Sequence, residues 1–101
     1  MNKIEVDFGY VIPLGETEEV SATILGILPG RKIAKHYHKK THEVEIVLYG
    51  EVIVNGTKKE RRDILVWKPG EIHEYENRSH KEARVLCIAM PKYDPSDTFE
   101  I

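Results

Sequence analysis

The sequence has little cysteine and no long apolar stretch. Cys87 is the only cysteine among 101 residues, so no disulfide can form within the chain. The longest apolar stretches, such as residues 24–29, are far shorter than the ~20 residues of a membrane-spanning helix. The N-terminal residues also lack the apolar core of a signal peptide. These absences exclude a disulfide-stapled fold, and we expect a cytoplasmic protein without a membrane partner.

The chain also has no strong charge of either sign. Its formal net charge is -2, so no global charge would recruit nucleic acid. Hydrophobic residues make up 41% and charged residues 32%, a composition typical of globular proteins. The length predicts a single domain over residues 1–101. Because so short a chain buries a modest core, we expect a homodimer, with residues 4–14 as an edge or exchanged strand.

Short apolar runs, cut by Gly, Pro and Asn, predict a β-protein. No stretch shows a capped helical period. Asn55-Gly56 lies between two such runs and is typical of a two-residue hairpin turn, because both residues tolerate positive φ. Several short strands with turns between them indicate an antiparallel barrel or sandwich. The expected strands cover residues 20–28, 43–49, 52–54, 64–67, 72–77 and 83–90.

Three histidines and a glutamate have the spacing of a metal site. His36 and His38 are two residues apart, and on a β-strand such side chains project from one face, about 6.5 Å apart along it. Such a pair alone more often lies on the protein surface and binds no metal. Glu43 opens the next strand, however, and His73 follows the turn at Pro69-Gly70. Three imidazoles and a carboxylate suit one divalent transition metal (Mn, Fe, Ni, Co or Zn), and suit Ca or Mg poorly.

His42 is an alternative to Glu43 as the fourth ligand, because the two are neighbours in the chain. Successive residues of a strand face opposite sides, so only one of them can point inwards. We assign the ligand role to Glu43.

These residues form a pattern that resembles the cupin superfamily. The first cupin motif is Gly, five residues, His-x-His, three or four residues, Glu, six residues and Gly. Gly30, His36, His38, Glu43 and Gly50 fill every fixed position. The resemblance implies a small single-domain cupin: an all-β double-stranded β-helix, or jelly-roll antiparallel barrel, with a metal at its centre.

The second cupin motif is matched in its latter half. It reads Gly, five residues, Pro-x-Gly, two residues, His, three residues and Asn, and Gly70, His73 and Asn77 fit it. Arg62 stands at the first Gly position and Lys68 at the Pro position. These departures leave the local turn open. They do not affect the position of His73, since Gly70 sets its spacing.

Two further residues are candidates for proton transfer. Glu45 shares the face of Glu43 by the two-residue period of a strand, and a carboxylate near a metal can act as general base. The alternative is a polar residue at the barrel mouth, or one on an outward face after a bulge. Tyr75 shares the face of His73, where it either hydrogen-bonds a substrate or fills the barrel.

The remaining notable residues have structural interpretations. Cys87 is expected to be a small buried apolar residue, and Trp67 a packing residue. Residues 58–62 are basic but contain Glu60, which favours a charge-protected edge strand over nucleic-acid binding. The irregular segment 91–101 either folds across the barrel mouth or hangs free.

A metal with open coordination positions suggests three functions. The first is an enzyme acting on a small polar metabolite, a sugar or a hydroxy- or keto-acid, of isomerase, epimerase or lyase type. Proton transfer would be carried out by Glu45, Tyr75 or a metal-bound water. The second is an iron-dependent dioxygenase with the same ligands. The third is a non-catalytic metabolite-binding or sensing module, although a lone domain has no effector domain to signal through. The sequence favours an enzyme and leaves the metal, substrate and reaction class open.

Overall fold

The computed structural model describes residues 2–101, which form short β-strands and one 3-10 helix. The expected all-β class is confirmed, since no α-helix occurs within these residues. No helix in this part of the chain is long and apolar enough to cross a membrane. The elements are β1 (Ile4–Val6), β2 (Gly9–Glu16), β3 (Ser21–Ile27), β4 (Lys32–Tyr37), β5 (His42–Tyr49), β6 (Glu51–Val54), β7 (Thr57–Glu60), β8 (Ile64–Trp67), β9 (His73–Glu76), β10 (Ala83–Met90), η1 (Pro95–Asp97) and β11 (Phe99–Glu100).

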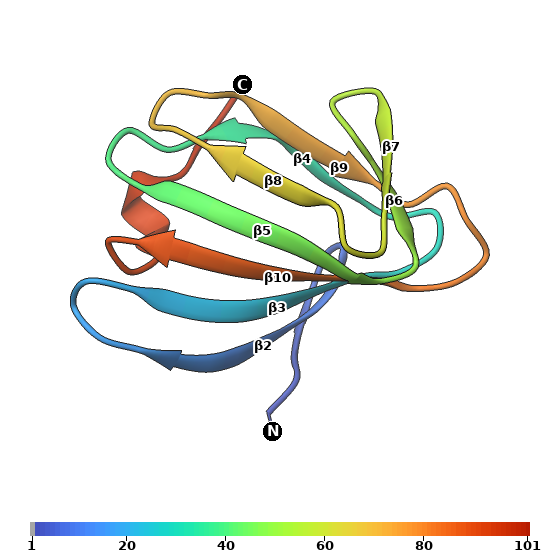
Figure 1. The fold of residues 1–101 in the computed structure, drawn as a ribbon, viewed down its shortest axis with the longest axis horizontal. Helices are drawn as coiled ribbons and strands as arrows, with labels where there is room; N and C mark the ends of the chain where they lie inside the picture. Colours follow the sequence, from blue (N-terminus) through green and yellow to red (C-terminus); the bar gives the residue numbers. More distant parts are fainter. Residues whose placement is uncertain (1) are drawn as a thin grey trace.

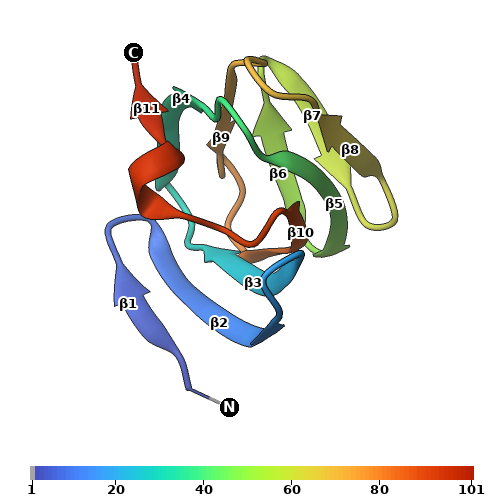
Figure 2. The same ribbon diagram turned by 90° about the vertical axis from the view of Figure 1, so that its left-hand side faces the viewer.

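The strands form two antiparallel sheets (Figure 1). One sheet has the order β1-β2-β3-β10-β5-β8 and the other β11-β4-β9-β6-β7. Figure 2 shows the sheets facing each other, with β1 and β2 opposite β4 and β11. Strands distant in the chain are neighbours, since β10 pairs with both β3 and β5. This is the arrangement of a jelly roll, as expected.

The inward face of β5 changes from polar to apolar along the strand. β5 buries Glu43 and Glu45 near its start and Val47 further on. Because β10 runs antiparallel, Val85 lies beside Val47 and Cys87 beside Glu45. Apolar side chains therefore fill one end of the space between the sheets, and polar groups collect at the other. The core cluster comprises Ile27, Val47, Val52, Val54, Leu65, Tyr75, Ala83 and Val85.

The two-residue turn at Asn55-Gly56 forms as expected. The φ angles are 47° at Asn55 and 83° at Gly56, and Val54 pairs with Thr57 across the turn. β7, which follows, lies at the edge of its sheet. Its charged side chains suit this position, because charges on an edge strand oppose pairing with another chain.

β1 is the edge strand of the other sheet. It pairs with β2 of its own chain, where Ile4 lies opposite Val11. The expectation of a single strand over residues 4–14 is therefore wrong in its bounds, because the chain turns at residues 7 and 8 and the range is divided between β1 and β2. Of these two strands only β1 is an edge strand, and β2 is paired on both sides.

Arg62, which stands where the second motif has glycine, adopts a glycine-like backbone. Its φ is 81°, in the left-handed region that costs a residue with a Cβ roughly 1–2 kcal/mol. Its N–H donates to the carbonyl of Val47 at 2.8 Å, which holds the turn in place. The N–H of Gly70, whose φ is 87°, donates to the carbonyl of His38 at 2.7 Å. The turns around β8 therefore form despite the departures from the motif.

Candidate metal centre

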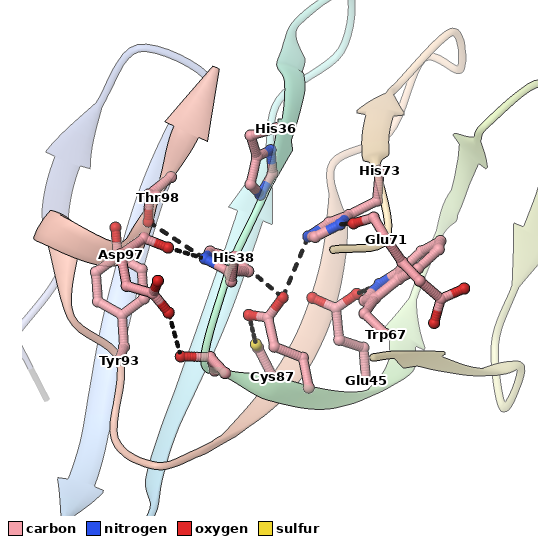
Figure 3. A network of polar contacts seen from close by, with 12 residues as sticks. His36, His38, Glu45, Trp67, Glu71, His73, Cys87, Tyr93, Asp97 and Thr98 are labelled. Atoms are coloured by element: carbon pink, nitrogen blue, oxygen red, sulfur yellow. Dashed lines mark hydrogen bonds and ion pairs between the residues drawn. The ribbon is translucent and has the colours of Figure 1, made fainter. Parts of the chain in front are cut away.

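Three histidines converge at the polar end of the space between the sheets (Figure 3). His36 lies near the end of β4, and His38 follows directly after that strand. His73 begins β9, where it pairs with His36. One ring nitrogen of each lies within 4.8 Å of the others. His38 and His73 are buried and His36 is half-buried, so the three rings meet largely away from solvent.

Backbone carbonyls orient all three imidazoles through Nδ1. For His36 and His73 the partner is the carbonyl two residues earlier, at 2.8 and 3.0 Å. For His38 it is the carbonyl of Asp97, at 2.9 Å. Because a carbonyl only accepts, Nδ1 carries the proton and Nε2 keeps a lone pair. This is the tautomer in which a histidine binds a metal through Nε2.

Glu43 supplies the fourth group. Its Oε1 lies 3.2 Å from Nε2 of His38 and 3.2 Å from Nε2 of His73. Its Oε2 accepts a hydrogen bond from Sγ of Cys87 at 3.2 Å. Burial disfavours the carboxylate, but the contacts with His38 and His73 outweigh it and hold the pKa of Glu43 well below its usual range. The same contact with Glu43 raises the pKa of His38.

The atoms that meet here fit a bound cation. His38 Nε2 and Glu43 Oε1 are buried, and neither has a hydrogen-bond partner within residues 2–101. Two ligand atoms each about 2.1 Å from one ion stand about 3.0–3.4 Å apart in octahedral or tetrahedral coordination. The 3.2 Å separations between Glu43 and the two histidines fall in this range. Imidazole and carboxylate donors suit a divalent transition metal.

The structure places His42 away from this cluster. Its side chain is exposed, whereas that of Glu43 is 5% exposed. The two are successive residues of β5 and therefore face opposite sides of the sheet. Glu43 is the one that lies beside the histidines.

Glu45 and Tyr75 both line the cavity next to the histidines and are buried. The Tyr75 hydroxyl donates a hydrogen bond to Glu45 Oε1, and Trp67 Nε1 donates to the same oxygen at 2.8 Å. Burial raises the pKa of Glu45 and raises that of Tyr75 well above its usual range. A carboxyl group that holds its proton unusually well therefore lies beside the candidate ligands.

Trp67 is more than a packing residue. Its indole stacks on the ring of His73, with centroids 4.6 Å apart and planes at 11°. Figure 3 shows Trp67 between His73 and Glu45. Because the same indole donates to Glu45, it joins the histidine cluster to the Glu45–Tyr75 pair.

The C-terminal segment closes one side of the site. The Asp97 carboxylate accepts from the N–H groups of Lys39 and Lys40, each at 3.0 Å, and from the Thr41 hydroxyl at 3.1 Å. Its backbone carbonyl holds His38, and β11 pairs with β4. Of the two alternatives for this segment, the structure excludes the one in which it hangs free, because Asp97 and Thr98 lie beside His38 (Figure 3).

A cavity of about 680 Å³ adjoins the cluster. The candidate ligands and Glu45, Tyr75 and Cys87 form its polar end. Aliphatic and aromatic side chains of β1 to β4 form the other end. These are Val6, Phe8, Val11, Leu25, Ile33 and Ala34.

Three residues of the site were not assigned a role in it from the sequence. Cys87 is buried as expected, and the two-residue period of its strand could have placed it on the face of the site. The two-residue period of its strand likewise places Trp67 on the inward face, but nothing in the sequence indicates that its ring stacks on His73. Asp97 contacts His38 across 59 positions of the chain, and no local pattern marks that pairing.

The chain is similar to known proteins in sequence and in fold. Residues 23–89, about two thirds of the chain, match the family model described as the cupin domain. The comparison with curated proteins found no match.

Three solved structures illustrate the likeness of fold. KdgF from Halomonas sp. has a TM-score of 0.85 at 18% identity, over 95% of this chain and 91% of that one. An uncharacterised conserved protein with a double-stranded β-helix domain from Klebsiella pneumoniae has a TM-score of 0.73 at 26% identity, over 78% and 73%. A sugar phosphate isomerase of the cupin superfamily from Silicibacter pomeroyi has a TM-score of 0.70 at 20% identity, over 80% and 58%.

Proposed function

Because the chain belongs to the cupin domain family, we propose that it is a metal-dependent enzyme acting on a small polar metabolite. The metabolite would be a sugar or a hydroxy- or keto-acid, and the reaction an isomerisation, epimerisation or lyase reaction. The observation that carries the proposal is the convergence of Glu43 Oε1 with Nε2 of His38 and His73, two of these atoms being buried without a hydrogen-bond partner among the described residues.

His36, His38, Glu43 and His73 would hold one divalent transition metal (Mn, Fe, Ni, Co or Zn). When bound, such an ion polarises a carbonyl or hydroxyl oxygen of the substrate. The carbonyl bonds to Nδ1 hold the three rings ready, so little ordering is required when the ion binds. Cys87 engages Oε2 of Glu43 and leaves Oε1 directed at the histidines.

Glu45 and Tyr75 would transfer protons to and from the substrate. They share a hydrogen bond and both line the cavity at the candidate ligands. As a carboxylate, Glu45 can take a proton from substrate carbon or oxygen and then return it as the carboxylic acid. The Tyr75 hydroxyl and the Trp67 N–H stabilise the carboxylate before the first transfer and after the second. The burial that raises the pKa of Glu45 suits this alternation.

Metal analysis of protein purified without an affinity tag tests the first part of the proposal. We expect one transition-metal ion per chain, or stoichiometric binding of an added ion in calorimetry. Activity is then measured over a panel of sugars and hydroxy- and keto-acids, with O₂ uptake recorded in parallel. Substrate-dependent O₂ uptake would replace the isomerase or lyase proposal with an iron-dependent dioxygenase. Protein that carries no metal under any loading condition would favour a metabolite-binding module instead.

We also propose that the protein is a homodimer, formed through the outer face of the six-stranded sheet. Two neighbouring rows of outward side chains across β3, β5, β8 and β10 are aliphatic, and Arg84 and His42 flank them on the same face. Ile64 and Val66 are 61% and 57% exposed. An aliphatic sheet face can pack on a two-fold copy of itself, as the faces of a sandwich do. The rows are Ile64, Ile46, Leu86, Ile24 and Val66, Val44, Ile88, Ala22.

A further inference from the structure

We propose that the substrate is a hydroxy- or keto-acid with an uncharged, apolar tail, and that a phosphate or second carboxylate on the tail excludes a molecule from the site. The inference rests on the proposed function in one respect: the acid group of the substrate, its head group, is taken to lie at the metal. What we infer about the tail rests on the side chains that line the cavity. The inference therefore excludes phosphorylated sugars and dicarboxylic acids from the small polar metabolites named in the proposed function.

The cavity has two chemically distinct ends. His36 lies at the polar end, and the same strand leads from it to Ala34 and Ile33 at the apolar end. Leu25 and Phe8 face into this end from the other sheet and from the β1–β2 turn, and like Ile33 they are only partly buried against the core. Water at this end has few polar partners, so an apolar tail that displaces it is bound favourably.

The cavity also lacks positive side chains. Within residues 2–101 no Lys or Arg lines it, whereas four glutamates do: Glu16, Glu43, Glu45 and Glu100. Lys92 contacts the wall residue Glu16 at 3.2 Å, but it is also paired with Glu18 at 3.3 Å. Sites for phosphate or carboxylate are typically built on Arg or Lys. All four glutamates are level with the candidate ligands, at the polar end. An anionic tail at the apolar end would lose its hydration and find no cationic side chain in the described lining, so its binding is disfavoured.

The acid group of the substrate is a different case, because it lies at the other end. Three imidazoles surround that end, and a bound divalent cation would balance the negative charge of one head group. The site therefore accepts one negative charge at the metal and none at the tail.

Isothermal titration calorimetry on the Co(II)-loaded protein tests the inference with 2-oxobutanoate, 2-oxohexanoate and 2-oxohexanedioate. The three probes share a head group and differ in the tail. Burying two more methylenes, at roughly 0.8 kcal/mol each, is expected to make 2-oxohexanoate about 15-fold tighter than 2-oxobutanoate. 2-Oxohexanedioate, of the same length but with a terminal carboxylate, is expected to bind at least about tenfold more weakly than 2-oxohexanoate.

A pair of variants at one residue of the apolar end tests the role of charge, one with a new charge and one without as its control. Val11 lines the apolar end and is half-buried. Val11→Lys is expected to reverse the order of the two six-carbon acids, whereas Val11→Met, which adds length without charge, keeps the wild-type order. Thermal unfolding and Co(II) titration of each variant check the fold and the metal site. Leu25→Lys offers a second position on the same wall if Val11→Lys does not fold.

Each result bears on one of two hypotheses. Equal affinity for the two six-carbon acids, tighter binding of the dicarboxylate, or no binding of any probe to the Co(II)-loaded protein would overturn the proposed substrate class and leave the metal centre standing. A wild-type protein that does not bind Co(II) or another transition metal would contradict the proposed function itself, and the substrate class with it.

Discussion

At the scale of single residues, the orientation of each imidazole decides whether the site can hold an ion. His36 and His73 are anchored by carbonyls two residues earlier in their own segments. His38 is anchored by Asp97, from the far end of the chain. In all three the proton is held at Nδ1, and the lone pair of Nε2 is left free to bind a metal. The three imidazoles of the candidate site are therefore oriented without a metal.

The double change His36→Ala with His38→Ala is expected to abolish tight metal binding while the fold persists. Two of the four candidate ligands are lost, whereas neither residue belongs to the hydrophobic core. Calorimetric titration with Co(II) and circular dichroism measure the two properties. His42→Ala is the control and should leave metal binding nearly intact, because that side chain is exposed on the opposite face. Loss of the metal in His42→Ala but not in Glu43→Ala would show that the ligand assignment is wrong.

Arg62→Gly is expected to stabilise the protein. The φ of 81° at this position suits glycine, so removal of the Cβ relieves the strain in the folded state. Glycine also makes the unfolded chain more flexible, which disfavours folding, but this effect is smaller than the strain relieved. The net gain in unfolding free energy should be about 0.5–1 kcal/mol, measured by urea denaturation. Arg61→Gly is the matched control: its backbone is not in the left-handed region, so it should gain nothing. Equal effects of the two changes would contradict this account.

At the scale of elements, the short helix η1 fastens the C-terminal segment to the loop after β4. Asp97 alone accepts three hydrogen bonds from that loop. The loop joins His38 to β5, which carries Glu43. The C-terminal segment thus holds in place the connection between two candidate ligands.

Asp97→Asn is expected to lower the unfolding free energy by about 1–3 kcal/mol at pH 7, because an amide nitrogen replaces an oxygen that accepts hydrogen bonds. Burial disfavours the Asp97 carboxylate, but the backbone N–H groups of Lys40 and Lys39 outweigh it and lower the pKa of Asp97. A lowered pKa in the folded state means that the stabilisation is complete above the unfolded value near ~3.9 and is lost as the pH falls through the folded value.

The difference between wild type and Asp97→Asn should therefore be constant from pH 7 to about pH 5 and shrink below about pH 4. Urea denaturation across this range measures it. Asp7→Asn, a change at an exposed aspartate, is the comparison and should have little effect at any pH. A difference that grows on acidification would contradict the role given to Asp97.

At the scale of the whole molecule, the two faces of the six-stranded sheet carry different kinds of side chain. The inner face carries the core at one end and the site at the other, and the outer face carries the aliphatic rows. A dimer through the outer face would cover those rows without touching the cavity.

We expect the wild type to be a dimer in light scattering at micromolar concentration. Ile64→Lys with Val66→Lys should make it a monomer, because the two charges on β8 cannot be buried against a second copy. Ile72→Lys, a change at an exposed residue between β8 and β9, is the control and should leave the dimer intact. A wild type that is monomeric at high micromolar concentration, or a dimer unaffected by the β8 changes, would contradict the proposed interface.

The sequence by itself determined the class of fold and the identity of the candidate ligands. Alternation along strands and turn residues such as Asn55-Gly56 act locally, so they can be recognised without a partner strand. The spacing of His36, His38, Glu43 and His73 was informative for the same reason. The two-residue period decides which face each side chain takes, as the opposite positions of His42 and Glu43 illustrate.

Tertiary structure decided what surrounds those ligands. The bond from His38 to Asp97, the stacking of Trp67 on His73 and the polar end of the cavity all join elements that are distant in the chain. Such contacts depend on which strands become neighbours, and local periodicity carries no information about that choice. The absence of Lys and Arg from the cavity lining, among the residues that the structure describes, is also visible only once the fold has selected that lining, because the chain has 15 Lys and Arg residues in all.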